Sequence, residues 1–142
     1  MAEFDLAAAQ ALLGDVFAPW VQDLSLRVED LQGDTAVLRM PFSDRLCRDG
    51  GIICGQSLMS LADTAMVIAV ASASGGYRPM TTVDLSVHFM KPASNHDVLC
   101  TARIMRMGKT MAFGHVTLNA EGNESPVVSA TTAYALLGPP PQ

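Results

Sequence analysis

The sequence contains few charged residues, since only 16% of its 142 residues are Asp, Glu, Lys or Arg. Nine Lys and Arg residues are scattered among fourteen acidic ones, and the formal net charge is −5. Nucleic-acid binding needs a concentrated basic surface, so nucleic acid is not expected as a partner. A low charged fraction in so short a chain also suggests that apolar surface is hidden in contacts between subunits.

Paired cysteines, a leader sequence and a membrane span are not expected either. Cys47, Cys54 and Cys100 form no CxxC pair, so neither a disulfide framework nor a zinc site is expected. The first twenty residues hold three acids and no base, unlike a signal peptide. No run of about 18 apolar residues is free of charge, so neither a membrane span nor a membrane partner is expected. These absences predict a cytoplasmic protein without a metal.

The residues that are present predict helices and strands in a definite order. Residues 5–18 are typical of an amphipathic helix ended by Pro19, and residues 24–29 and 35–42 alternate as two strands of a hairpin. We expect an N-terminal helical segment over residues 1–20, a main domain over residues 21–138 and a disordered proline-rich tail over residues 139–142.

Residues 55–73 are apolar or small on almost every helical face, which indicates a helix inside the protein that ends at Gly75-Gly76. Four long strands follow, over residues 81–90, 98–107, 110–120 and 126–137. They lack crossover helices and must therefore be antiparallel, and only the apolar helix can cover one face of their sheet. The sequence predicts an α+β fold in which a curved antiparallel sheet wraps a long central helix.

Two features of this helix indicate chemistry. Asp63 lies within the apolar run, and a carboxylate held largely out of water can serve as a general base or nucleophile. Alternatively, Asp63 points to a solvent-lined edge or caps a backbone group. At the start of the helix, the backbone N–H of Gly55 could stabilise an oxyanion, although Gly50, Gly51 and Gly55 also suit a simple turn and a tight helix entry.

The segment GQSLMSLADTA at residues 55–65 resembles the hot-dog-fold thioesterases of the phenylacetate-degradation, or PaaI-like, type. TTVD at residues 81–84, VHFMKPA at 87–93, MGKT at 107–110 and TTAY at 131–134 extend the resemblance, which runs from about Leu24 to Leu137. It implies a hot-dog fold that hydrolyses an acyl- or aryl-acyl-CoA to the free acid and CoA. It also implies homodimers joined edge to edge, usually paired into homotetramers, with two sites at each dimer interface and no cofactor beyond the CoA of the substrate.

The resemblance assigns three catalytic roles. Asp63 would activate water or attack the thioester directly. Gly55 would donate its N–H to the oxyanion from the subunit opposite that Asp63, and Thr82 would help to position the attacking water.

Three positions depart from the pattern of the family. Cys54 occupies the position of the family's usual His, and Gln56 occupies the position of the second Gly in its HGG motif. Arg48 occupies a position where the family has an Asn or Gln. Cys54 has no His near it in sequence, which favours a small buried thiol over a nucleophile. Either Arg48 or Gln56 takes over the polarising role of the missing residues, or the chemistry is weakened.

Substrate contacts are expected from basic residues near strand ends and from apolar residues of the helix. The CoA phosphates would meet Lys109 above all, and after it Arg106, Lys91 and Arg103, although each could be an ordinary solvated charge. The acyl pocket would be lined by Leu58, Met59 and Met66.

Two functions remain open from the sequence. A thioesterase is favoured by Asp63 and Gly55, whereas the missing His and Asn favour a non-catalytic acyl-CoA-binding protein of the same fold. The sequence does not identify the acyl group, and it does not separate a dimer from a tetramer.

Overall fold

The structure is a computed structural model that describes residues 3–142. The chain forms two short helices, a hairpin, one long helix and four strands in succession. The elements are α1 (Leu6–Asp15), α2 (Pro19–Gln22), β1 (Arg27–Gln32), β2 (Thr35–Met40), α3 (Gly55–Ser74), β3 (Met80–Phe89), β4 (Val98–Met107), β5 (Met111–Ala120) and β6 (Val128–Leu136), with the 3-10 turns η1 (Asp44–Leu46) and η2 (Asp49–Gly51) between β2 and α3.

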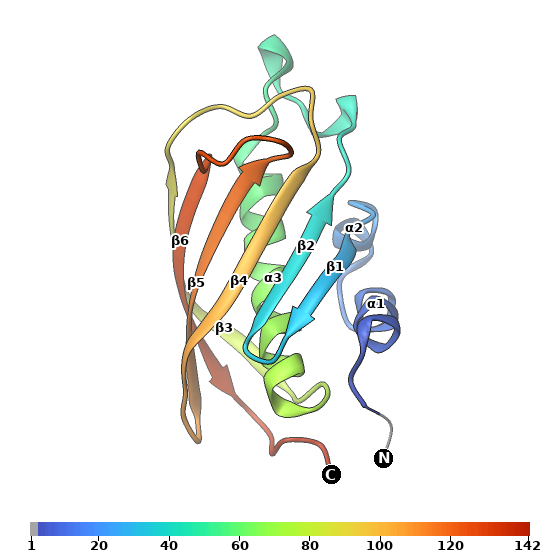
Figure 1. Cartoon of the computed structure of the whole chain (residues 1–142), viewed down its shortest axis with the longest axis vertical. Coiled ribbons are helices and arrows are strands. Elements are labelled where there is room, and N and C mark those ends of the chain that lie inside the picture. The colour runs from blue at the N-terminus through green and yellow to red at the C-terminus, as the bar shows by residue number, and fades with distance from the viewer. Residues whose placement is uncertain (1–2) are drawn as a thin grey trace.

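The strands form one six-stranded sheet in the order β1-β2-β4-β5-β6-β3, with each neighbouring pair antiparallel. Figure 1 shows this sheet curving around α3, with α1 and α2 beyond its β1 edge. The predicted α+β architecture is confirmed. The first and last strands in this order, β1 and β3, are the free edges of the sheet.

Helix α3 forms the centre of the core, and 11 of its 20 residues are buried. It ends at Gly75, whose left-handed backbone (φ 75°) lets its N–H donate to the carbonyls of Ala71 and Ser72, as the sequence predicted. By length and composition α3 could cross a membrane, but 67% of its most apolar window is buried inside this fold. That burial fits the core helix of a wrapped sheet.

Gly114 on β5 allows α3 to approach the sheet closely. A Cβ atom at this position would lie 2.4 Å from the Sδ atom of Met66, so no larger residue fits unless Met66 moves. Met66 is fully buried against this strand. Met66 therefore lies on the side of α3 that packs on the sheet, and its predicted place in the acyl pocket stays a prediction.

The N-terminal region differs from the prediction in two ways. Pro19 begins the separate helix α2 instead of only ending α1, a position where its missing N–H costs nothing. Strand β1 starts at Arg27, three residues later than expected, because the chain turns at Ser25 with a φ of 56°. Residues of α1 join the main hydrophobic core, and the side chain of Gln10 bonds to the backbone of Leu26 and Val28.

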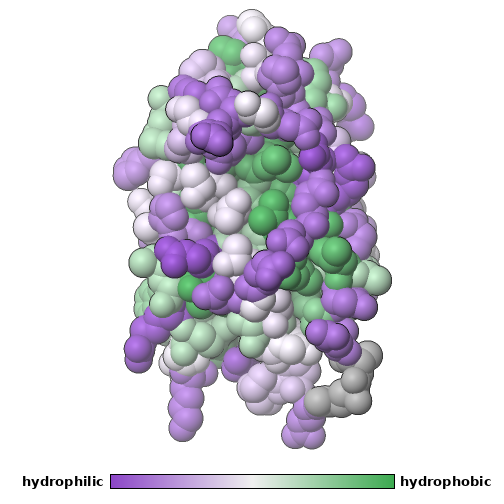
Figure 2. Space-filling view, in the orientation of Figure 1, coloured by the Kyte–Doolittle hydropathy of each residue, from purple (hydrophilic) through white to green (hydrophobic). Residues whose placement is uncertain are grey.

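Helix α1 ends three residues before the predicted end and β1 ends three residues after it, whereas all boundaries from β2 onward lie within about two residues of those predicted. Figure 2 shows the face of the sheet that is turned away from α3, where a small hydrophobic group near the middle is bordered by hydrophilic residues.

Candidate active site

Asp63 lies in the middle of α3, and two hydroxyl groups hold its carboxylate. Thr82 donates from Oγ1 to Oδ1 of Asp63 at 2.8 Å. The Tyr134 hydroxyl donates to the same oxygen, and it also lies 2.7 Å from the backbone carbonyl of Asp63. No residue within 3–142 donates to the second oxygen, Oδ2. One carboxylate oxygen is thus fixed in place, and the other is left free to act.

The two donors come from neighbouring strands. Thr82 on β3 and Tyr134 on β6 are direct partners in the β3–β6 register, and a bulge follows at once between Thr82 and Asp84. Bulges of this kind redirect side chains next to functional sites. Burial and the adjacent Asp63 charge raise the pKa of Tyr134, so its hydroxyl stays protonated and remains a donor at any physiological pH.

Asp63 is half-buried and opens onto two hollows, so it is less withdrawn from water than the sequence suggested. The first hollow, of about 300 Å³, runs along the outer face of α3 past Gln56 and Met59. The second, of about 260 Å³, lies between α3, the start of β3 and the N-terminal helices. Asp63, Ser60 and Trp20 line both hollows.

Gly55 is the first residue of α3, where backbone N–H groups have no partner within the helix. Cys54 precedes it and offers no side-chain cap. The Cys54 backbone is occupied, since its N–H donates to Leu46 and its carbonyl accepts from the Ser57 hydroxyl at 2.8 Å. The helix start is therefore open to an incoming anion or carbonyl oxygen, with the helix dipole behind it.

A third hollow, of about 460 Å³, lies at this helix start and contains two cations. Its lining includes Gly55, Leu58, Arg48 and Lys91. Arg48 is mostly exposed, and among the described residues it pairs only with its exposed neighbour Asp49, at 3.2 Å. The hollow therefore combines free N–H groups with two positive charges.

The carboxylate and the open helix start are too far apart to act together within one protomer. Eight residues separate Gly55 from Asp63, which corresponds to about 12 Å along an α-helix. A single thioester carbonyl cannot meet both groups of the same chain.

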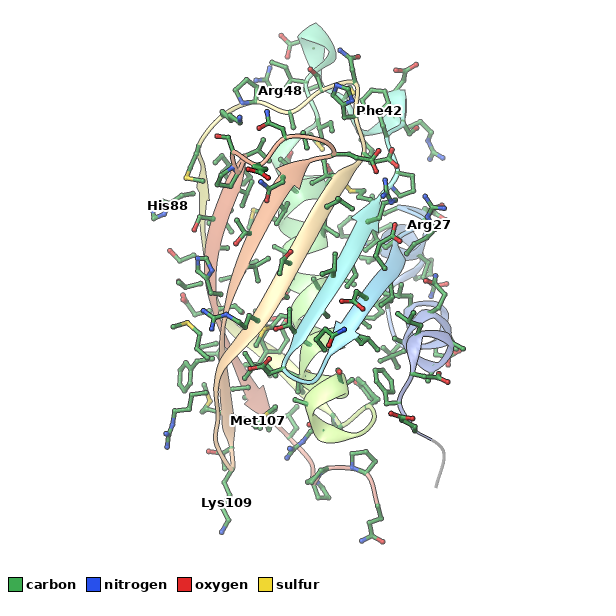
Figure 3. The ribbon with its side chains drawn as sticks, viewed as in Figure 1. Arg27, Phe42, Arg48, His88, Met107 and Lys109 are labelled. Carbon is green, nitrogen blue, oxygen red and sulfur yellow. The ribbon has the colours of Figure 1, made fainter. Side chains whose placement is uncertain are left out.

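The remaining predicted binding residues lie at the other end of the molecule. Lys109 is in the turn between β4 and β5, and Arg106 is near the end of β4. Figure 3 shows Met107 and Lys109 at the end of the molecule opposite to Arg48. Within one protomer, the structure does not bring Lys109 to the hollow at Gly55.

The sequence reasoning missed three residues around Asp63: Tyr134, Ser60 and Trp20. Tyr134 alternates with the apolar residues of its strand and is only 1% exposed, so it resembles ordinary core. Ser60 lies one turn before Asp63 on the same helix face, a spacing that could have identified it. Trp20 left no such signal, because its contact with this region depends on the tertiary fold.

No group of three or more His, Cys, Asp and Glu residues that could hold a metal ion is found in the described part of the chain. The chemistry available here is that of a carboxylate with two hydroxyl donors, backbone N–H groups and surface cations.

Comparisons with known proteins identify the family of this chain. The family model of the thioesterase superfamily matches residues 50–127, which include Gly55, Asp63 and Thr82. No curated protein matches the sequence significantly. Among solved structures, a candidate thioesterase from Silicibacter sp. is 30% identical, with a TM-score of 0.84 over 96% of this chain and 94% of that one.

Two more distant structures share the fold. A thioesterase from Haemophilus influenzae is 16% identical, with a TM-score of 0.85 over 96% of this chain and 93% of that one. The PaaI protein from the phenylacetic acid degradation operon of E. coli is 17% identical, with a TM-score of 0.80 over 96% of this chain and 99% of that one. With its central helix, curved antiparallel sheet and matching family model, the chain belongs to the thioesterase superfamily and has the hot-dog fold of its PaaI-like members.

Proposed function

We propose that this protein is an acyl-CoA thioesterase in which Asp63 is the catalytic carboxylate. The observation that carries the proposal is the asymmetric environment of Asp63. Thr82 and Tyr134 both donate to Oδ1, whereas Oδ2 accepts no hydrogen bond from the described residues and the side chain opens onto two hollows. A fixed carboxylate with one free oxygen suits proton abstraction from water.

The reaction is a simple hydrolysis. The free oxygen of Asp63 takes a proton from water while the water oxygen bonds to the thioester carbon, and the carbonyl oxygen becomes an oxyanion. A backbone N–H at a helix start stabilises this oxyanion. The C–S bond then breaks, the CoA thiolate receives the proton from Asp63, and the free acid leaves. In the alternative, Asp63 attacks the carbonyl directly and water hydrolyses the resulting anhydride.

We propose that the oxyanion donor is Gly55 of a second protomer. Gln56, Met59, Ser60 and Asp63 form a stripe on one face of α3 that this chain leaves partly uncovered, although most of the helix is buried. Beside it, the free edge strand β3 is exposed over most of its length. Long exposed edges of this kind favour pairing with another strand.

A two-fold pairing of β3 with its copy would place the middle of one α3 beside the start of the other. The axis would lie near Met59, halfway between Gly55 and Asp63. Each dimer would then hold two sites, each made from both chains. Pairing of such dimers into tetramers stays a prediction.

The CoA phosphates would bind at the open helix start. Arg48 and Lys91 line the same hollow as Gly55 and supply two positive charges there. The antiparallel pairing of β3 would also bring the Lys109 end of one protomer toward the Gly55 end of the other. Lys109, with Arg106 behind it, would in this way reach the phosphates from the partner side.

The experiment is a thiol-release assay with acyl-CoAs from acetyl to decanoyl and with aryl-acyl-CoAs. Wild-type protein should release CoA, and Asp63→Asn should lower kcat by about 10²–10⁴-fold, the usual contribution of a general base. The control is Asp30→Asn, an exposed carboxylate on β1 that lines none of these hollows. Thermal melting should show that both variants fold.

An unchanged kcat in Asp63→Asn would remove Asp63 from the mechanism. Tight binding of acyl-CoA by wild-type protein, with no hydrolysis across the panel, would instead select the non-catalytic binding protein.

A further inference from the structure

The N-terminal helices close one side of the second hollow at Asp63. This hollow, of about 260 Å³, has an apolar wall formed by Phe17, Trp20 and Val21, which lie in and next to α2. Val67 and Met80 face this wall, and Asp63 and its two hydroxyl donors lie at one side. A segment that the sequence separates from the main domain therefore contributes to the region around the carboxylate.

Trp20 occupies a special place in this wall. It lines the hollow below the N-terminal helices and also the hollow along α3, and Asp63 lines both. The Trp20 side chain is 58% exposed, although tryptophan is usually well buried. An exposed indole at the junction of two hollows is better placed to contact a ligand than to stabilise the core.

The wall is anchored to the rest of the protein. Gln22 donates from its side chain to the Phe17 carbonyl at 2.7 Å, which closes the turn that carries Trp20. Pro19 fixes the first turn of α2. The side chain of Gln10 ties α1 to the backbone at Leu26 and Val28. Trp20 is therefore presented by a fixed backbone.

The two arms of an acyl-CoA have opposite requirements at Asp63. The CoA arm carries phosphates and needs cations, which are found in the hollow at Gly55. The hollow under the N-terminal helices has no basic residue among its described lining residues, and five of its side chains are apolar. Its chemistry suits the acyl arm. Its volume of about 260 Å³ lies just below the roughly 300–1,000 Å³ typical of pockets for drug-sized ligands, which favours a compact acyl group.

We propose that the hollow under the N-terminal helices is the acyl pocket and that Trp20 determines its specificity by limiting the length of the acyl group. This proposal rests on the proposed function and adds the residue that selects the substrate. A compact apolar acyl group, branched or cyclic, would pack against the indole. A long chain would meet Trp20 before its thioester reached Asp63.

Trp20 also provides its own reporter, because it is the only tryptophan in the chain. The Asp63→Asn variant, which keeps substrates intact, is titrated with benzoyl-CoA, hexanoyl-CoA and free CoA while tryptophan emission is recorded. Benzoyl-CoA should change the intensity or wavelength of emission, and free CoA should leave both unchanged. Equal responses to benzoyl-CoA and to free CoA would overturn the acyl pocket at Trp20.

The second arm measures kcat/KM for compact and long acyl-CoAs. Trp20→Ala should raise the ratio of kcat/KM for decanoyl-CoA to kcat/KM for benzoyl-CoA by about tenfold or more. This is the change expected when a pocket gains room for several methylenes. Trp20→Phe should shift it less. The matched control is Phe113→Ala, an exposed aromatic on β5 that lines none of these hollows. Melting curves show whether each variant folds.

The outcomes separate this proposal from the proposed function. Wild-type protein could hydrolyse acyl-CoA while benzoyl-CoA leaves the tryptophan emission unchanged and Trp20→Ala leaves the kcat/KM ratio unchanged. That result would overturn the acyl pocket but not the thioesterase. An emission change with benzoyl-CoA but no hydrolysis by wild-type protein would support the pocket and overturn the thioesterase.

Discussion

The two ends of the proposed site differ in how completely one chain builds them. At Asp63, hydroxyls from two neighbouring strands hold one carboxylate oxygen in a fixed place. At Gly55, the helix start has no side-chain cap, and of the two cations beside it Arg48 is exposed and Lys91 is half-buried. The carboxylate end is complete within one protomer, whereas the amide end is open and lies about 12 Å from it.

This difference shows which part of the proposed site the fold of one chain builds and which part requires a second protomer. The β3–β6 pairing and the core around α3 prepare the carboxylate before any partner arrives. The oxyanion donor needs no such preparation, since the first N–H groups of a helix have no partner within it and no side chain caps the start of α3. Dimer formation would then bring a carboxylate that is already positioned to a backbone N–H that is already free, and neither chain would need to change conformation.

Among the variants that follow, the one that removes the Gly55 N–H should lower kcat most. Gly55→Pro deletes the donor at a position that tolerates proline, because it is the first residue of α3 and Cys54 already has an extended backbone (φ −67°, ψ 146°). We expect kcat to fall by about 10²–10³-fold, as when one oxyanion donor is lost. Thiol release measures the change.

Gly55→Ala is the matched control for this variant. Its Cβ would approach the exposed Phe89 ring at 3.3 Å, as the proline ring must, but it keeps the N–H. Alanine should retain most of the activity. An equal loss in both variants would show that contact with Phe89, and not the donor, matters.

Removing a donor at the other end should have a smaller effect. Tyr134→Phe leaves Thr82 as the only hydroxyl on Oδ1 of Asp63, so the carboxylate loses part of its orientation. We expect kcat to fall by about 10- to 100-fold with little change in KM, and stability to fall by about 1–2 kcal/mol. Steady-state kinetics and urea denaturation measure both quantities. A rise in KM with kcat unchanged would mean that Tyr134 only shapes the pocket.

The cations near Gly55 should affect substrate binding alone. Arg48→Gln and Lys91→Gln should each raise KM for acyl-CoA by several-fold at low salt and much less at about 0.5 M salt, because salt screens exposed charges. The control is Arg45→Gln, an exposed cation on η1 that does not line this hollow. If KM stays the same in both variants and at both salt concentrations, the phosphates bind elsewhere.

A charge cluster far from Asp63 should affect stability and leave activity unchanged. Asp97 accepts from the Phe42 N–H at 2.7 Å and from Arg39 at 2.9 Å, and these two donors hold its pKa below the ordinary value of 3.8. Its stabilising effect is complete above pH 3.8 and is lost as pH falls through the lowered pKa. Asp97→Asn should therefore cost about 1 kcal/mol at pH 7 and progressively less near pH 3. Urea denaturation at the two pH values measures this, and an equal cost at both would contradict the assignment.

Much of the fold could be predicted from the sequence because its signals are local. The apolar run around Asp63 identified α3, and Gly75 marked the end of that helix. The start of β1 was mispredicted because Leu24 and Leu26 alternate like a strand, while the backbone turns between them at Ser25. Apolar spacing alone does not report a positive φ.

Candidate site residues could be predicted only where the chain itself carries the signal. Asp63 could be proposed because a carboxylate in an apolar helix is unusual. Its partner Tyr134 lies 71 residues away, and only the register of β3 and β6 brings it to Asp63. The packing of Met66 against Gly114 was not predicted, because helical spacing does not tell which side of α3 meets that residue. The predicted cytoplasmic location has no counterpart in the structure and stays a prediction.

The most direct test of the central claim, that one site uses Asp63 of one protomer and Gly55 of its partner, is subunit complementation. Asp63→Asn and Gly55→Pro are each assayed alone and then after co-expression in equal amounts. A dimer that contains one copy of each variant would hold one site with both groups intact, so random pairing predicts recovery of about a quarter of wild-type turnover in a two-fold symmetric dimer. Turnover of the mixture equal to the average of the two separate variants would contradict a site shared between protomers.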